Sequence, residues 1–270
     1  MKRASLAFLV MMLLTACRGQ QPLPATSATP LPDFPIEPYR SARPDQNYRL
    51  LNDLSRVDII VRRGGSLARF GHDHVVSTTD ISGILLVDRE KPELSMADLR
   101  LDLDSLVVDQ PELRRQYRLD TVPSEEDIRK TTANMQSRVL QTQIWPQVHL
   151  HLEATSGSME ELEARVTVDL HGQQHSFSTR VDILEPDGDT LLAQGRFTLR
   201  QSEYGIEPFS VLGGGLQVLD EVEVNYRLTA RRLSLPNSSL PARMAPAVPI
   251  AGQSEHKAGL PGRHNPRRGG

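Results

Sequence analysis

The sequence predicts an all-β fold, an antiparallel barrel with one short crossover helix. Three observations lead to this prediction. Apolar and polar residues alternate with a period of two through most of residues 47–232, as they do in half-buried strands. Only one segment shows helical spacing instead, and strands do not alternate with helices as they do in parallel α/β sheets. Closure into a barrel removes the sheet edges and creates an interior that can hold a ligand.

The alternation is clearest in two segments. Leu99, Leu101 and Leu103 are separated by charged residues, so one face of this strand is expected to be buried and the other wet. Residues 148–152 repeat the pattern, with histidines between the apolar positions. Further runs of the same kind follow, and turn-forming residues separate three of them into an antiparallel meander.

The single helix is predicted between the two halves of the sheet. Ser124 and Asp127 have the spacing of a capping box, which marks a helix start. Apolar residues then recur at helical spacing from Ile128 to Leu140, and Pro146 follows as a stop signal.

The composition excludes two broad classes. The chain has 270 residues with a formal net charge of -3, so nucleic acid is not an expected partner. Hydrophobic residues make up 38% and the mean hydropathy is -0.37, which excludes a polytopic membrane protein. Aromatic residues are only 4%, so the predicted interior is mainly aliphatic and suits a long aliphatic guest.

The N-terminus carries a secretory signal. Residues 1–16 combine Lys2 and Arg3 with a short apolar run, and small residues precede Cys17, the only cysteine. This arrangement resembles the lipobox of bacterial lipoproteins, which implies cleavage before Cys17 and lipidation of its thiol. The residue that follows is Arg18, and by analogy with enterobacterial sorting this favours the outer membrane, facing the periplasm. An ordinary signal peptide with a free cysteine is the alternative.

Two segments outside the domain show no regular spacing of apolar residues. Residues 17–46 are rich in Pro, Ser and Thr and are predicted to be a tether. Residues 236–270 have a positive excess and are predicted to be a disordered basic tail. The barrel domain is therefore placed at residues 47–235.

Sequence blocks in a characteristic order extend over this whole domain. They are YRL from Tyr48, SGILLVD at 82–88, LRLDLDSLVVD at 99–109, VLQTQIWPQVHL at 139–150, LHGQQHSFSTRV at 170–181, and the block at 195–230 that contains YGI, PF and VLGGGLQVLD. Together they resemble the YceI-like family, periplasmic lipocalin-like barrels associated with polyisoprenoid binding.

The resemblance implies an eight-stranded, closed or nearly closed barrel whose apolar channel takes an isoprenoid quinone or a similar long-chain amphiphile. It also makes a homodimer a further expectation. The residues offered as contacts with such a ligand are Leu101, Leu103, Leu150, Val168, Phe197 and Phe209 in the channel or at its rim, with His72 and His74 near the headgroup.

Two His-x-His pairs leave a metal site open as an alternative. On a strand, this spacing puts two imidazoles on one face, where they bind a metal if a third ligand approaches. His72 and His74 lie on a glycine-containing turn, whereas His149 and His151 are expected on the outer face of their strand. No nucleophile, phosphate-loop or cofactor motif occurs, so no enzymatic activity and no cofactor are expected. A structural envelope protein with a filled barrel is the third hypothesis.

Overall fold

The structure is a computed structural model that describes residues 35–233. The predicted signal peptide at 1–16, the lipidation site Cys17 and the predicted tail at 236–270 lie outside the described residues.

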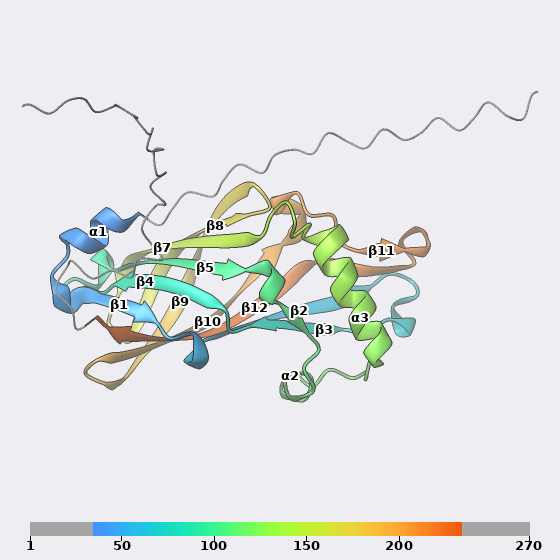
Figure 1. Ribbon diagram of the computed structural model, residues 1–270, viewed down its shortest axis with the longest axis horizontal. Helices are drawn as coiled ribbons and strands as arrows, with labels where there is room; N and C mark the ends of the chain where they lie inside the picture. The colour runs from blue at the N-terminus through green and yellow to red at the C-terminus, as the bar shows by residue number, and fades with distance from the viewer. Residues whose placement is uncertain (1–34, 234–270) are drawn as a thin grey trace, which may run out of the picture.

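The described chain folds into one antiparallel sheet with short helices around it (Figure 1). The strands are β1 (Asn47–Leu50), β2 (Arg56–Gly64), β3 (His74–Thr78), β4 (Ile81–Leu86), β5 (Met96–Asp102), β6 (Val107–Val108), β7 (Gln147–Gly157), β8 (Glu161–Leu170), β9 (Gln173–Asp187), β10 (Thr190–Arg200), β11 (Ser210–Val211) and β12 (Leu216–Arg232). The helices are α1 (Ile36–Ser41), α2 (Pro111–Gln116) and α3 (Glu125–Asn134).

The sheet closes into the predicted eight-stranded barrel. β1 and β2 pair with successive parts of the same edge of β12. β4 pairs with β1, and β3 pairs with β2. On their other edges, β4 pairs with β5 and β3 pairs with β6. Each of these three pairs of strands therefore serves as one long, interrupted strand. With β7, β8, β9, β10 and β12 they form a ring in which chain neighbours are also sheet neighbours. The predicted fold class is confirmed.

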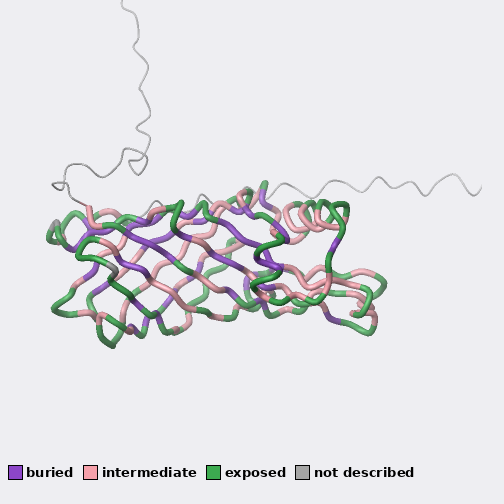
Figure 2. Tube along the Cα trace, turned by 90° about the horizontal axis from the view of Figure 1, so that it is seen from below, coloured by how far each residue is buried: buried purple, intermediate pink, exposed green. Residues whose placement is uncertain are grey.

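Buried and exposed residues alternate along the strands (Figure 2), as the period-two pattern predicts. At the barrel end beside α1 the inward side chains pack against one another and fill the interior. This packed end contains Tyr48, Leu50, Leu162, Ile183 and Leu191.

The predicted helix lies across the opposite end of the barrel (Figure 1). The side chain of Ser124 accepts a hydrogen bond from the Asp127 backbone, and the Asp127 side chain accepts one from the Ser124 backbone, so the capping box is confirmed. α3 then continues as a π-helical turn (Met135–Val139). No helix among the residues that the structure describes is long and apolar enough to cross a bilayer.

The prediction of a tether over residues 17–46 is wrong at its C-terminal end. Residues 36–41 form α1, and Tyr39 is 1% exposed. Its hydroxyl donates a hydrogen bond of 2.5 Å to Asp98 on the outer face of β5, and its carbonyl accepts one from Asn47. Burial, with the hydrogen bond to Asp98, raises the pKa of Tyr39. One buried aromatic residue thus attaches the segment to the barrel.

Candidate functional site

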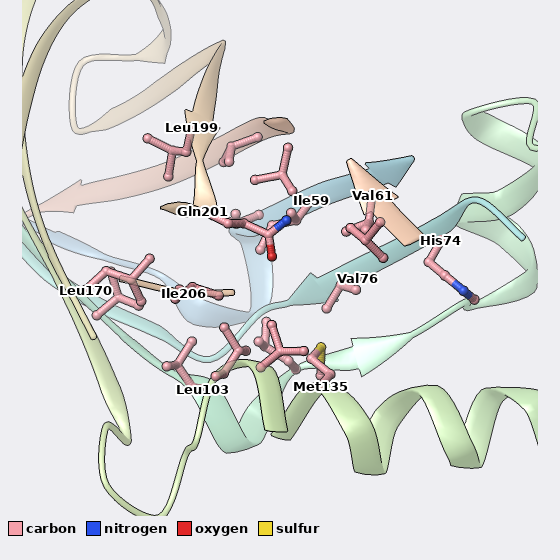
Figure 3. Close-up of a pocket in the computed structure, with 18 of the residues that line it drawn as sticks. Ile59, Val61, His74, Val76, Leu103, Met135, Leu170, Leu199, Gln201 and Ile206 are labelled. Carbon is pink, nitrogen blue, oxygen red and sulfur yellow. The ribbon is translucent and has the colours of Figure 1, made fainter. Parts of the chain in front are cut away.

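The barrel is hollow at the end that α3 crosses. An apolar cavity of about 570 Å³ begins there and extends between the inward faces of the strands. Met135 points from the helical side into this space, opposite Ile59 and Val61 of β2 (Figure 3). The exposed residues Phe70 and Lys130 also line the cavity and therefore mark its mouth. Because the other barrel end is packed, the cavity is blind.

Several side chains deep inside the barrel are only half-buried. Leu150 of β7, Phe197 and Leu199 of β10 face inward and line the cavity, yet none is fully buried. Their exposed surface borders the cavity itself, because the barrel wall surrounds them. The interior consequently has unfilled apolar surface that a guest could cover.

The structure places all eight predicted contact residues on the cavity wall. They are Leu101, Leu103, Leu150, Val168, Phe197, Phe209, His72 and His74. Five of them lie on strands, and their side chains are on the inward face of the sheet: His74 on β3, Leu101 on β5, Leu150 on β7, Val168 on β8 and Phe197 on β10. Phe209 follows the last turn before β11, with the guanidinium of Arg138 5.1 Å from its ring centre. Their contact with a ligand remains a prediction.

A buried hydrogen-bonded cluster holds His74 at the mouth. Its Nδ1 atom lies 2.6 Å from Oδ2 of Asp109, a residue that is 2% exposed. The other carboxylate oxygen of Asp109 accepts hydrogen bonds from the Val75 backbone at 3.1 Å and from Arg114 of α2 at 2.6 Å. Since an ionised carboxylate only accepts, Nδ1 of His74 donates its proton, and Nε2 is left for other partners.

Asp109 is ionised in spite of its burial. Desolvation alone would raise the pKa of this carboxyl group, but the hydrogen bonds and charges of His74, Val75 and Arg114 outweigh it, and the pKa lies below its ordinary value. The charge of Arg114 balances that of Asp109 inside the protein. Together they fix the orientation of the His74 ring.

His72 lies beside His74 but has a different environment. The two ring centres are 6.2 Å apart, and the buried Nδ1 atom of His72 has no hydrogen-bond partner. Asp127 of α3 carries a negative charge near His72, and both residues line the cavity. Within residues 35–233 no group of three or more His, Cys, Asp or Glu side chains is arranged to hold a metal ion. Among these described residues, the pair therefore has no third ligand of the kind that the metal hypothesis requires.

The second histidine pair lies on the outer face of the barrel. Nε2 of His149 accepts a hydrogen bond of 2.8 Å from Arg100 on β5. His151 contacts Asp98 with a distance of 2.8 Å between Nδ1 and Oδ1, and this contact raises the pKa of His151. Asp98 also accepts a hydrogen bond from the hydroxyl of Tyr39, so Tyr39, Asp98 and His151 together connect α1 to the strands β5 and β7.

Sequence reasoning missed part of the cavity wall. Met135, Val139 and Leu140 reach it from the helical side, and Tyr226 reaches it from β12. The helical spacing of the first three and the alternation of β12 were visible signals. Their inward direction depends on how the helix lies over the barrel, which local pattern does not specify.

Comparison with known proteins agrees with this geometry. Residues 48–230 match the model of the YceI-like domain. The chain belongs to the YceI-like family. A search of curated protein sequences gives no match.

Two solved structures are similar to this chain. BcnA from Burkholderia cenocepacia superposes with a TM-score of 0.51 at 12% identity, over 67% of this chain and 98% of its own. A polyisoprenoid binding domain from Saccharophagus degradans, implicated in plant cell wall breakdown, gives a TM-score of 0.49 at 14% identity, over 69% of this chain and 98% of its own. At these identities the BcnA match supports the fold alone.

Proposed function

We propose that this YceI-like protein binds a long-chain isoprenoid lipid or a quinone-like amphiphile inside the barrel, as a carrier or store without enzymatic activity. The observation that carries the proposal is the blind cavity, whose wall is mainly apolar and carries charged and imidazole side chains at its mouth. Family membership supports the same class of ligand, which the sequence resemblance implies. An unfilled interior also argues against a purely structural role with a packed barrel.

Burial of the tail provides the affinity. At about 25 cal/mol per Å² of apolar surface, a guest that hides several hundred Å² gains roughly 10 kcal/mol before ordering costs. No hydrogen bond is needed along the tail. Leu101, Leu150 and Val168 contact it only through dispersion.

The polar groups at the mouth orient the guest. In this proposal the tail enters first, because the packed end beside α1 offers no exit and no solvent. The headgroup then lies near Nε2 of His74 and beside His72, where it meets the hydrogen-bonding groups of the wall. A quinone carbonyl or a prenol hydroxyl can pair with an imidazole there.

In this proposal, the protein acts in the bacterial envelope. Lipidation of Cys17 anchors the chain to the outer membrane, and the remaining tether, residues 18–35, holds the barrel in the periplasm. A membrane-anchored barrel stays close to the lipids that would supply its guest.

Native mass spectrometry of the full chain, combined with organic extraction and metal analysis, tests the proposal. The expected result is a polyprenyl or quinone mass that is released by solvent. Leu199→Trp fills the cavity and should lower lipid occupancy, whereas the neighbouring outward change Thr198→Trp should not. Chain without lipid, or lipid retained equally by both variants, would contradict the proposal. Stoichiometric metal lost in a His72→Ala, His74→Ala variant would support the metal hypothesis instead.

A further inference from the structure

The cavity mouth is bordered by an exposed apolar surface. It consists of Phe70 in the β2–β3 loop, which is 65% exposed, Leu212 at the tip of the β11–β12 hairpin, which is 74% exposed, and Leu219, which is 42% exposed. We call these three residues the apolar rim. Phe70 also lines the cavity, so the rim is continuous with the apolar interior.

Two loops that are distant in sequence meet to form this rim. The backbone N–H of Leu67 donates a hydrogen bond of 2.7 Å to the carbonyl of Gly215. A Cβ on Gly71 would lie 2.7 Å from the side chain of Leu216, so the loops also pack directly on each other. Both project beyond the barrel at the same end in Figure 1. Phe70 and Leu212 therefore belong to one surface.

Charged residues are few in these loops. Residues 208–219 contain no Asp, Glu, Lys or Arg, although such residues make up 24% of the whole chain. Residues 65–73 contain Arg69, whose guanidinium lies 4.6 Å from the centre of the Phe70 ring, and Asp73, whose charge is paired with Arg62 and Arg63. An aromatic ring beside an arginine suits the boundary between acyl chains and phosphate headgroups.

Leu212 occupies a costly backbone conformation. Its φ of 54° lies in the left-handed region that favours glycine or asparagine. A chain that only needed a hairpin turn would do better with glycine here. The position instead carries a leucine whose side chain faces solvent, which indicates a partner for it.

We infer that the apolar rim docks onto a lipid bilayer, with Phe70 and Leu212 inserted into the interface and the cavity mouth facing the acyl chains. The guest then passes between bilayer and cavity without crossing water. Docking itself requires only the rim, whereas transfer of a guest rests on the proposed function. A second copy of the chain covering the rim is the competing occupant.

A fluorescent probe at one position tests the docking. Cys17 is the only cysteine, so Cys17→Ser gives a cysteine-free, unlipidated full chain to which a single new cysteine can be added. An environment-sensitive dye is attached at Leu212→Cys, or at Leu184→Cys as the control. Leu184 is 51% exposed on β9 but does not belong to the rim. Neither position lines the cavity.

Docking predicts a blue shift for the dye at position 212, and none at 184, when vesicles of phosphatidylethanolamine and phosphatidylglycerol are added. This comparison holds even if another segment retains the chain on the vesicle. No shift at 212, or equal shifts at both positions, would overturn the inference. A shift at 212 without vesicles that rises with protein concentration would show that a second copy covers the rim, and would overturn it too.

Leu212→Gly separates docking from folding. Glycine relieves the left-handed backbone, so the variant should be at least as thermally stable as the parent. When it is combined with Phe70→Ser, the fraction of protein that floats with vesicles should nevertheless fall about tenfold. Lipid binding by the dye-labelled chains in detergent micelles measures occupancy of the cavity independently of docking. If the chains dock but bind no lipid, the proposed function is contradicted and the docking inference still holds.

Discussion

Nδ1 of His74 lies 2.6 Å from Oδ2 of Asp109, and this contact connects the cavity mouth to a buried ion pair. The other oxygen of Asp109 accepts from Arg114, whose side chain is 8% exposed. The cluster therefore positions an imidazole and anchors α2 to β3.

Removing the charge of Asp109 should destabilise the fold. Asp109→Asn keeps a residue that tolerates the φ of 58° at this position but leaves Arg114 buried without its counter-ion. We expect a loss of about 3 kcal/mol in the free energy of unfolding, measured by urea denaturation at pH 7. Asp104→Ala, an exposed aspartate on the same segment, should change it by less than about 0.5 kcal/mol. Equal effects would contradict the assigned role.

The attachment of α1 to the barrel predicts a large effect at Tyr39. Tyr39→Ala should cost about 3 kcal/mol, because it removes a buried aromatic ring and its hydrogen bond to Asp98. Arg40→Ala, on the exposed side of α1, should be near neutral. Limited proteolysis between residues 36 and 46 should accelerate only in the first variant. Rapid cleavage of the parent chain there would restore the interpretation of this segment as a tether.

The His151 contact predicts a pH-dependent stability. Its hydrogen bond with Asp98 raises the pKa of His151 above the unfolded value, so the contact contributes fully below about pH 6.5 and fades as pH rises through the folded pKa. His151→Gln should therefore cost about 1 kcal/mol near pH 5.5 and much less near pH 9. Unfolding of both proteins across this range measures the difference. A difference that grows with pH would have the wrong sign.

Two half-buried tyrosines should respond differently to loss of their hydroxyl groups. The hydroxyl of Tyr226 is buried without a hydrogen-bond partner, and burial raises its pKa. Tyr226→Phe should leave stability unchanged or raise it by up to about 1 kcal/mol. The hydroxyl of Tyr117 donates to the buried Asp58 at 2.8 Å, so Tyr117→Phe should cost about 1.5 kcal/mol. Thermal unfolding of the two variants checks the contrast, and a loss at Tyr226 would show that its hydroxyl is hydrogen-bonded after all.

Period-two alternation was sufficient to predict the strands and their apolar faces, because a strand with one buried face must alternate. It placed Leu101 and Leu150 on such faces, whereas the inward direction of each face follows from the closed barrel. The capping box at Ser124 was equally local, since its partners are three residues apart. These features depend on near neighbours in the chain.

What could not be predicted depends on distant partners. Tyr39 is buried where its hydroxyl meets Asp98, a residue of β5 that lies 59 positions further along the chain. The segment around it is rich in proline and has no apolar period, so nothing local distinguishes it from a tether. Arg114 likewise looks like a surface arginine until α2 places it against Asp109. The absence of a third metal ligand near His72, within the described residues, also emerges only from the packed structure.

Binding of a C40 isoprenoid quinone in the barrel is measured as its affinity, in detergent, for the parent chain, Leu199→Trp and Thr198→Trp. Leu199 faces the cavity and Thr198 faces solvent on the same strand. We expect tight binding by the parent and by Thr198→Trp, and at least about tenfold weaker binding by Leu199→Trp, because the indole occupies space that the tail needs. Equal affinities in all three proteins, or no binding by the parent chain, would contradict binding in the barrel.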